Sequence, residues 1–301
     1  MKKVISLLMS FVMLFSIISG VNLSAYAEES ATSGKCGDNV YWSYDITTNT
    51  LTISGTGAMY NYNGDASWDE YCEDILTVKI ETGVTTIGEC AFEDCRSLTS
   101  ITIPNSVTTI GWSAFSHCSS LTSVKIPDSV TTIGKRAFSD CSSLTSVTIP
   151  DSVTTIVECA FFDCSSLTSV TIPNSVTKIG DSAFNGCSSL TSVTIPNSVT
   201  TIGNYAFQLC FSLISVTIPN SVTTIGEYAF YCCSNLTSVT IPDSVTTIGE
   251  WVFKDCKSLT SIDVASDNLN YSSEDGVFFD KNKSKLIQYP AGNQRTEYTI
   301  P

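Results

Sequence analysis

Residues 110–130 read Ile-Gly-Trp-Ser-Ala-Phe-Ser-His-Cys-Ser-Ser-Leu-Thr-Ser-Val-Lys-Ile-Pro-Asp-Ser-Val, and this stretch recurs almost unchanged along most of the chain. Its first residue returns every 23 positions, at Ile87, Ile110, Ile133, Ile156, Ile179, Ile202, Ile225 and Ile248. A fixed period of about 20 to 50 residues is typical of a solenoid, in which each repeat buries its apolar face only against its neighbours. The sequence therefore predicts a stack of repeats whose extended surface suits recognition better than catalysis.

Within one repeat, two kinds of spacing follow each other. Leu98, Ile101 and Ile103 alternate with Ser and Thr, which predicts a strand with one buried face. Pro104 ends this strand because proline cannot donate a ladder hydrogen bond, and an Asn-Ser turn follows. Around and after Gly111 the inward residues are spaced four, one and three apart, which predicts a short helical turn. These residues are Ile110, Ala114, Phe115 and Cys118.

The positions at which the repeats differ support this assignment of faces. We call each position within the 23-residue repeat a phase. Variation is concentrated in the phases of Glu89, Cys90, Glu93, Asp94 and Arg96, which we expect to point outward. The eight inward phases scarcely change. One departure, Val157 where the other copies have glycine, is expected to strain its turn slightly.

The 13 cysteines raise the question of disulfides. Equivalent side chains of stacked repeats lie about 4.8 Å apart and point the same way, whereas a disulfide needs Cβ atoms about 3.5–4.5 Å apart that face each other. We therefore expect mostly free thiols, with the periodic cysteines serving as small buried apolar groups. The periodic set is Cys72, Cys95, Cys118, Cys141, Cys164, Cys187, Cys210, Cys233 and Cys256, and the redox state of Cys36, Cys90, Cys159 and Cys232 stays open.

The full pattern, Leu-x-x-Val-x-Ile-Pro-x-Ser-Val-x-x-Ile-Gly-x-x-Ala-Phe-x-x-Cys-x-x-Leu, resembles the BspA-like (Treponema-type) leucine-rich repeats over roughly residues 72–265. The resemblance implies an α/β repeat fold: a right-handed curved solenoid with a parallel β-sheet on the concave face and short helical turns on the convex face. It also implies a secreted or surface-bound bacterial protein. Several proteins of this family act as adhesins.

The two flanks of the repeats predict different segments. Residues 1–27 have a basic start, an apolar run and an Ala-x-Ala site, which predict a cleaved secretory signal peptide, with an uncleaved membrane anchor as the alternative. A linker over 28–35 and an N-terminal β-hairpin cap over 36–64 are expected to precede the repeats of 65–265. Trp42 and Trp68 are expected to pack in this cap.

The segment 266–301 predicts one irregular, elongated repeat. It holds a β-hairpin, formed by residues 276–280 and 286–290, and the sequence stops in the middle of a repeat. We therefore expect either a fragment of a longer protein or an end that pairs with another element.

Charge and motifs exclude several function classes. Without Lys2 and Lys3 the chain carries 13 basic and 29 acidic residues, a net charge of −16 instead of −14, which argues against nucleic acid or anionic lipid as a partner. The one histidine, His117, lies in a variable outward phase, and no nucleophile elbow, phosphate loop, zinc spacing or dinucleotide fingerprint is present. We expect no enzymatic activity, no cofactor and no catalytic metal.

Three outward features are candidate binding surfaces. Stacked strands would present rows of Ser and Thr, beginning with Ser100 and Thr102, although threonine also simply suits an exposed strand. The row after the prolines, beginning with Asn105 and Asp128, could ligate calcium, but Asn and Asp are also ordinary turn residues. The third feature is an aromatic group formed by Tyr205, Tyr228 and Trp251 in one phase, with Tyr231 and Phe211 in nearby phases.

These observations lead to two hypotheses for function. The first is a secreted or cell-surface binding module, such as an adhesin, that recognises an extracellular protein or glycan through the solenoid surface. The second is a passive stalk of a larger surface protein whose anchor or enzymatic domain lies beyond Pro301. The ligand and the oligomeric state are not specified by the sequence.

Overall fold

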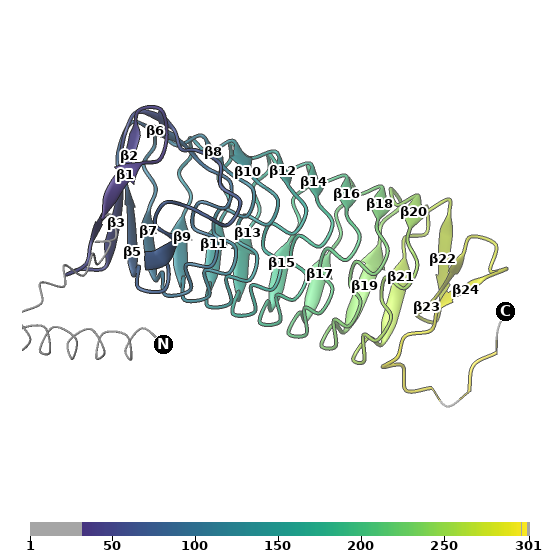
Figure 1. Cartoon of the computed structure of the whole chain (residues 1–301). Coiled ribbons are helices and arrows are strands. Elements are labelled where there is room, and N and C mark those ends of the chain that lie inside the picture. The colour runs from purple at the N-terminus through teal and green to yellow at the C-terminus, as the bar shows by residue number, and fades with distance from the viewer. Residues whose placement is uncertain (1–31, 296, 300–301) are drawn as a thin grey trace, which may run out of the picture. The chain divides into compact units, whose positions relative to one another are not determined.

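The computed structural model describes residues 32–295 and 297–299, and the predicted signal peptide lies outside them. It confirms a solenoid of 23-residue repeats built on parallel strands (Figure 1). One row of strands, the strand ladder, consists of β5 (Thr77–Ile80), β7 (Ser100–Thr102), β9 (Ser123–Lys125), β11 (Ser146–Thr148), β13 (Ser169–Thr171), β15 (Ser192–Thr194), β17 (Ser215–Thr217), β19 (Ser238–Ile241) and β21 (Ser261–Val264). Where neighbouring strands pair, equivalent residues are partners, so the register is one repeat.

A second row of parallel strands lies where the chain returns to the core after each proline turn. This short-strand ladder consists of β6 (Val84–Ile87), β8 (Thr109–Ile110), β10 (Thr132–Ile133), β12 (Thr155–Ile156), β14 (Lys178–Ile179), β16 (Thr201–Ile202), β18 (Thr224–Ile225) and β20 (Thr247–Ile248). The sequence placed these residues in the core but did not predict a second sheet. Each repeat thus contributes two parallel strands.

The third side of each repeat is not the helical turn that the spacing predicted. In residues 111–118, Ser113 and His117 adopt the left-handed conformation, with φ of 49° and 60°. The amides of Ser113, Phe115 and His117 donate to carbonyls of the next repeat at 2.8–2.9 Å, and the amides between them bond within the turn. In a helix these amides would donate to carbonyls of the same turn. Here they donate to carbonyls of the next repeat instead. We call this third set of hydrogen bonds between repeats the turn ladder. Among the described residues the one helix is the 3₁₀ segment η1 (Asp69–Tyr71).

A stack of phenylalanines fills the core beneath the turn ladder. Adjacent rings lie 5.3–5.7 Å apart between centroids and within 2–13° of parallel. Trp68 of the N-terminal segment stacks on the first of them, Phe92, at 5.6 Å. Stacking contacts of this kind contribute about 0.5–1.5 kcal/mol per pair beyond the burial of area. The members are Phe92, Phe115, Phe138, Phe161, Phe184, Phe207, Phe230 and Phe253.

Conserved serines and cysteines link the repeats through their side chains. The Cys118 thiol donates to the Phe92 carbonyl at 3.1 Å, and the same contact recurs in each repeat up to Cys256. The Ser106 hydroxyl likewise donates to the Val84 carbonyl at 2.7 Å. Burial raises the pKa of these periodic thiols, so they remain protonated donors.

The expectation of mostly free thiols is confirmed, but the argument that periodic cysteines of adjacent repeats do not bridge is wrong at its first step. Cys72 and Cys95 form a disulfide with their Cα atoms 4.3 Å apart. Cys72 directly follows η1, so its turn differs from the regular turns that hold other periodic cysteines parallel. The remaining eleven cysteines are free. Cys90, expected to face outward, is buried, as is Ser113 in the same phase, because these short side chains do not reach past their neighbours as Arg136 does.

The substitution of glycine by Val157 interrupts the short-strand ladder. In the regular repeats the backbones are so close that a Cβ on Gly134 would lie 2.5 Å from the Gly111 carbonyl carbon. The valine Cβ cannot be accommodated there, and within the described residues β10 and β12 do not pair. The amide bond to the preceding repeat, which Gly134 and Gly180 make at 2.9 and 2.7 Å, is absent at Val157. The predicted strain therefore appears as a break between two sheets.

The predicted hairpin cap is confirmed at the N-terminal end. β2 (Val40–Asp45) and β3 (Thr50–Gly55) pair antiparallel, and β3 continues in parallel onto β5. β1 (Ser33–Lys35), in the expected linker, pairs with β2, and β4 (Gly57–Ala58) pairs with β6. Trp68 is fully buried, its ring contacts Trp42, and its indole N–H donates to the Ala91 carbonyl at 3.0 Å.

The C-terminal segment forms a three-stranded antiparallel sheet of β22 (Tyr271–Glu274), β23 (Val277–Asp280) and β24 (Leu286–Gln288). The predicted hairpin residues lie in β23 and β24, and Figure 1 shows the sheet beyond β20 and β21. Asn268, fully buried where regular repeats have valine, donates to the carbonyls of Pro242 and Val245. This amide ties the irregular segment to the last regular repeat.

Restoring glycine at the interruption should stabilise the chain. Val157→Gly removes the Cβ and allows about two backbone hydrogen bonds to form, each contributing about 1 kcal/mol, against about 1 kcal/mol for the added flexibility of glycine. We expect a net gain of about 1 kcal/mol in the free energy of unfolding, measured by urea denaturation. The matched control Gly180→Val, whose Cβ would lie 2.8 Å from the Ile156 carbonyl oxygen, should lose stability. Equal stability of Val157→Gly and the parent would contradict this account.

Thiol titration tests the single disulfide. In the native chain we expect only Cys159 and Cys232, the two free cysteines that are not fully buried, to react with an aromatic disulfide reagent. Burial raises the pKa of Cys36 and of Cys90 to about 12, which removes the reactive thiolate at neutral pH. Denaturation without reductant should expose eleven thiols, and prior reduction all 13. Thirteen thiols before reduction would show that Cys72 and Cys95 are not joined.

Candidate functional site

Three of the predicted aromatic residues occupy one phase of the turn ladder on successive repeats. Tyr205, Tyr228 and Trp251 share the left-handed backbone of that phase, with φ of 57°, 54° and 61°. The amides of Tyr205 and Tyr228 donate to the carbonyls of the following repeat at 2.8 and 2.9 Å. The backbone is thus fixed by the ladder, so the side chains are held at constant spacing along the surface.

The rings form a partly exposed cluster. Tyr205 and Tyr228 stack with centroids 5.1 Å apart and planes 7° from parallel, and Tyr231 meets Tyr228 edge-on at 5.5 Å. Trp251 is 49% exposed, and the Lys254 ammonium lies 4.3 Å from its ring centroid. We call Tyr205, Tyr228, Tyr231 and Trp251 the aromatic strip. Its flat, rigid faces can contact apolar or sugar groups of a ligand with little loss of side-chain entropy.

Phe211 does not join the strip. It is 43% exposed, and in the described part of the chain its ring contacts no other aromatic ring. Ile214, three residues later, is 53% exposed. The structure therefore brings three of the five predicted residues, Tyr205, Tyr228 and Tyr231, into ring contact. Trp251 follows one repeat later in the same phase and contacts Lys254 instead.

One phenol of the strip has a strongly perturbed proton affinity. Hydrogen bonding to the Cys232 side chain, with a further contribution from Asp255, raises the pKa of Tyr231 to about 12. Tyr231 therefore stays a neutral hydrogen-bond donor across the physiological range.

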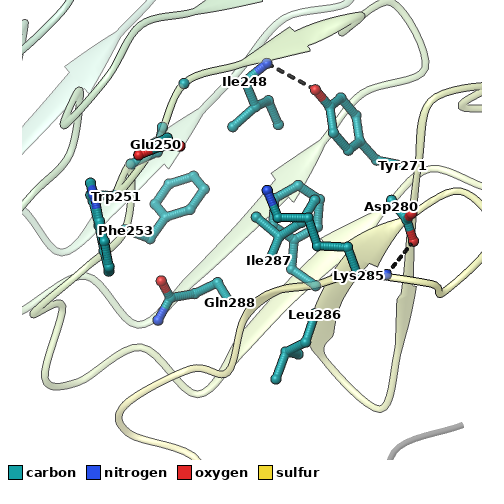
Figure 2. A pocket seen from close by; sticks show the side chains of 13 residues that line it. Ile248, Glu250, Trp251, Phe253, Tyr271, Asp280, Lys285, Leu286, Ile287 and Gln288 are labelled. Atoms are coloured by element: carbon teal, nitrogen blue, oxygen red, sulfur yellow. Dashed lines mark hydrogen bonds between the residues drawn. The ribbon is translucent and has the colours of Figure 1, made fainter.

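A pocket of about 440 Å³ adjoins the strip at Trp251. It lies between the last regular turn and the C-terminal sheet, and Figure 2 shows Trp251 and Phe253 on one side and Ile287 and Gln288 on the other. Its remaining lining residues include Ile248, Glu250, Tyr271, Phe278, Asp280, Lys285 and Leu286. The sequence did not predict this pocket, because the residues of β22–β24 break the 23-residue period and their facing cannot be obtained by aligning phases.

The other two candidate surfaces are exposed, and hydrogen-bonded hydroxyls lie beside the first of them. Hydroxyls beside the strand ladder, such as Thr99 and Thr145, donate to carbonyls of the preceding repeat, whereas Ser100 and Thr102 are exposed. Asn105 and its equivalents occupy exposed turn positions. No group of three metal-ligating side chains is found among the residues that the structure describes.

His117 faces an acidic side chain of the next repeat. Its Nδ1 lies 3.8 Å from the Asp140 carboxylate, and both side chains are partly exposed. Within the described residues, no helix has the length and apolar character needed to cross a membrane.

Comparison with known proteins gives a consistent family. The BspA type leucine rich repeat region model, in six copies, matches residues 66–191 and 177–298. A leucine-rich repeat protein from Bacteroides ovatus is 27% identical with a TM-score of 0.60, covering 76% of this chain and 70% of its own. A leucine-rich repeat protein from Eubacterium ventriosum is 25% identical with a TM-score of 0.29, and the match covers 90% of this chain but 54% of that chain. The Treponema pallidum leucine-rich repeat protein is 21% identical with a TM-score of 0.40, over 75% of this chain and 91% of that one.

Among curated proteins, none matches the chain. The repeat family is generally non-enzymatic and indicates a protein-interaction or surface module.

Proposed function

Because the chain belongs to the BspA-type leucine-rich repeat family, we propose that it is a secreted or cell-surface binding module that recognises an extracellular protein or glycan. The observation that carries the proposal is the aromatic strip, in which Tyr205 and Tyr228 stack and Trp251 remains half exposed beside a pocket. Exposed clustered aromatics on a rigid scaffold are typical of interaction sites.

The scaffold supports recognition in two ways. The strip is mounted on backbone that is hydrogen-bonded to the next repeat, so little order has to be gained on binding. The net charge of −14 favours ligands that are neutral or basic and disfavours nucleic acid. The apolar start and Ala-x-Ala site of residues 1–27 support export, after which the module acts outside the cell.

The alternative is a passive stalk. The observation that favours it is the continuity of the hydrogen-bonded turn ladder, which would make the array a stiff spacer. A stalk needs no ligand, so the two proposals differ in whether the isolated chain binds anything through the strip.

Replacing the strip should weaken binding. We would screen residues 28–301 against matrix proteins and glycans, then measure the affinity of a Tyr205→Ala/Tyr228→Ala/Trp251→Ala variant by calorimetry. Loss of these contacts should weaken binding at least tenfold, which corresponds to about 1.4 kcal/mol or more. Trp112→Ala, which removes a 41% exposed indole outside the strip, is the control and should bind as the parent does. A panel without any ligand, or a triple variant that binds unchanged, would favour the stalk.

A further inference from the structure

The turn ladder ends in three amides that have no partner among the described residues. In each regular turn, alternate amides donate forward to the next repeat, as Tyr228, Phe230 and Cys232 do to Glu250, Val252 and Lys254 at 2.9–3.0 Å. The equivalent amides of the last turn belong to Trp251, Phe253 and Asp255. No described residue accepts a hydrogen bond from any of the three. We call this row the open edge.

The other forward-facing amides of the last repeat are capped by the C-terminal segment. Ile248 donates to the Tyr271 hydroxyl at 2.9 Å, Ile262 to the Gly276 carbonyl at 2.8 Å, and Val264 to the Ser273 hydroxyl at 2.9 Å. The three-stranded sheet thus closes the strand ladder and the short-strand ladder. It leaves the turn ladder unpaired.

At the opposite end of the turn ladder, the cap occupies two of the three equivalent carbonyls. There the carbonyls of Glu89 and Ala91 face away from the array, and they accept from the Tyr62 amide at 2.9 Å and the Trp68 indole at 3.0 Å. A second copy of this chain, stacked head to tail, would have to present these same carbonyls to the open edge. Because the cap already occupies two of the three carbonyls, the edge is poorly matched to self-association.

The pocket described above lies at the open edge. In the earlier repeats, each phenylalanine of the stack packs one ring face against the next ring. Phe253 is the last member, and its corresponding face lines a space of about 440 Å³ together with Trp251, Phe278 and Ile287. An apolar side chain of a bound segment can enter this space while its backbone pairs with the amides. Carboxylates of Glu250 and Asp280 line the rim with Lys285, and Asp255 is exposed at the end of the edge.

We propose that the open edge binds a short polypeptide segment of a partner protein. Carbonyl oxygens on alternate residues of the segment accept from the amides of Trp251, Phe253 and Asp255. One apolar side chain fills the pocket, and neighbouring lysine or arginine residues face the carboxylates. A glycan is not matched to this edge, because its hydroxyls do not repeat acceptors at the spacing of alternate residues. This mode of main-chain pairing with pocket recognition is known from peptide-binding sheets, and here it does not require the aromatic strip beyond Trp251.

The free chain gives the first test. In ¹⁵N-labelled residues 28–301, we expect the amides of Trp251, Phe253 and Asp255 to exchange with solvent at least a hundredfold faster than those of Tyr228, Phe230 and Cys232. The two sets occupy equivalent positions one repeat apart, so the second set is an internal control. Equal protection of both sets would overturn the proposal.

Binding gives the second test. A display library of random decapeptides without cysteine is selected on the chain, and enriched peptides are synthesised and titrated. We expect an apolar residue flanked by basic residues, and slowed exchange at the three amides on binding. Gln288→Trp, which fills the pocket, should weaken binding at least tenfold, whereas Leu269→Trp, at an 81% exposed residue outside the pocket, should not. Tyr205→Ala/Tyr228→Ala should also bind normally, which separates this edge from the strip. Thermal unfolding verifies that each variant is folded.

Three outcomes would overturn the proposal. They are a library without enriched peptides, peptides that bind Gln288→Trp as well as the parent, and concentration-dependent protection of the three amides in the absence of peptide, which would indicate self-association.

Discussion

Each regular repeat is bound to the next by backbone hydrogen bonds at an offset of one repeat, without interruption on the turn side and with breaks between sheets on the two strand sides. Because equivalent residues are thereby held about one strand spacing apart, every buried side chain must pack against its own copy. This constraint explains the parallel phenylalanine stack and the cysteine thiols that all donate to the same kind of carbonyl. It also explains why glycine is needed after each short strand, where Val157 splits the sheet.

The repeat pattern was sufficient to predict the solenoid, its inward phases and the hairpin cap, because each is a direct consequence of periodicity or alternation. The turn was not predicted correctly. Inward residues spaced four, one and three apart fit a helix as well as a series of left-handed turns, and the spacing alone cannot separate them. A partial signal was the phase of His117, which most other repeats fill with Asp or Gly, residues that tolerate positive φ better than most, although Leu209 and Cys232 also occupy it.

Prediction of the candidate site succeeded where the period continues and failed where it stops. Tyr205 and Tyr228 stack because they occupy the same phase, and the phase of a residue can be assigned directly from the sequence. The far wall of the pocket comes from Ile287 and Gln288 in a sheet with no counterpart in the other repeats. Likewise, Cys72, which pairs with Cys95, follows the irregular turn of η1, and a rule derived from regular repeats does not apply there.

A stack of repeats joined by hydrogen bonds has one set of unpaired backbone donors or acceptors at each end. The two ends of this chain differ in how these groups are paired. At the N-terminal end an indole and a backbone amide replace the missing donors. At the C-terminal end a tyrosine and a serine hydroxyl replace missing acceptors on two sides, while the third side borders an aromatic pocket. Unpaired donors are costly unless water or a ligand meets them. The same turn carries Trp251, the most exposed ring of the strip, so both candidate modes of recognition meet at the end of the array where the repeat pattern is broken.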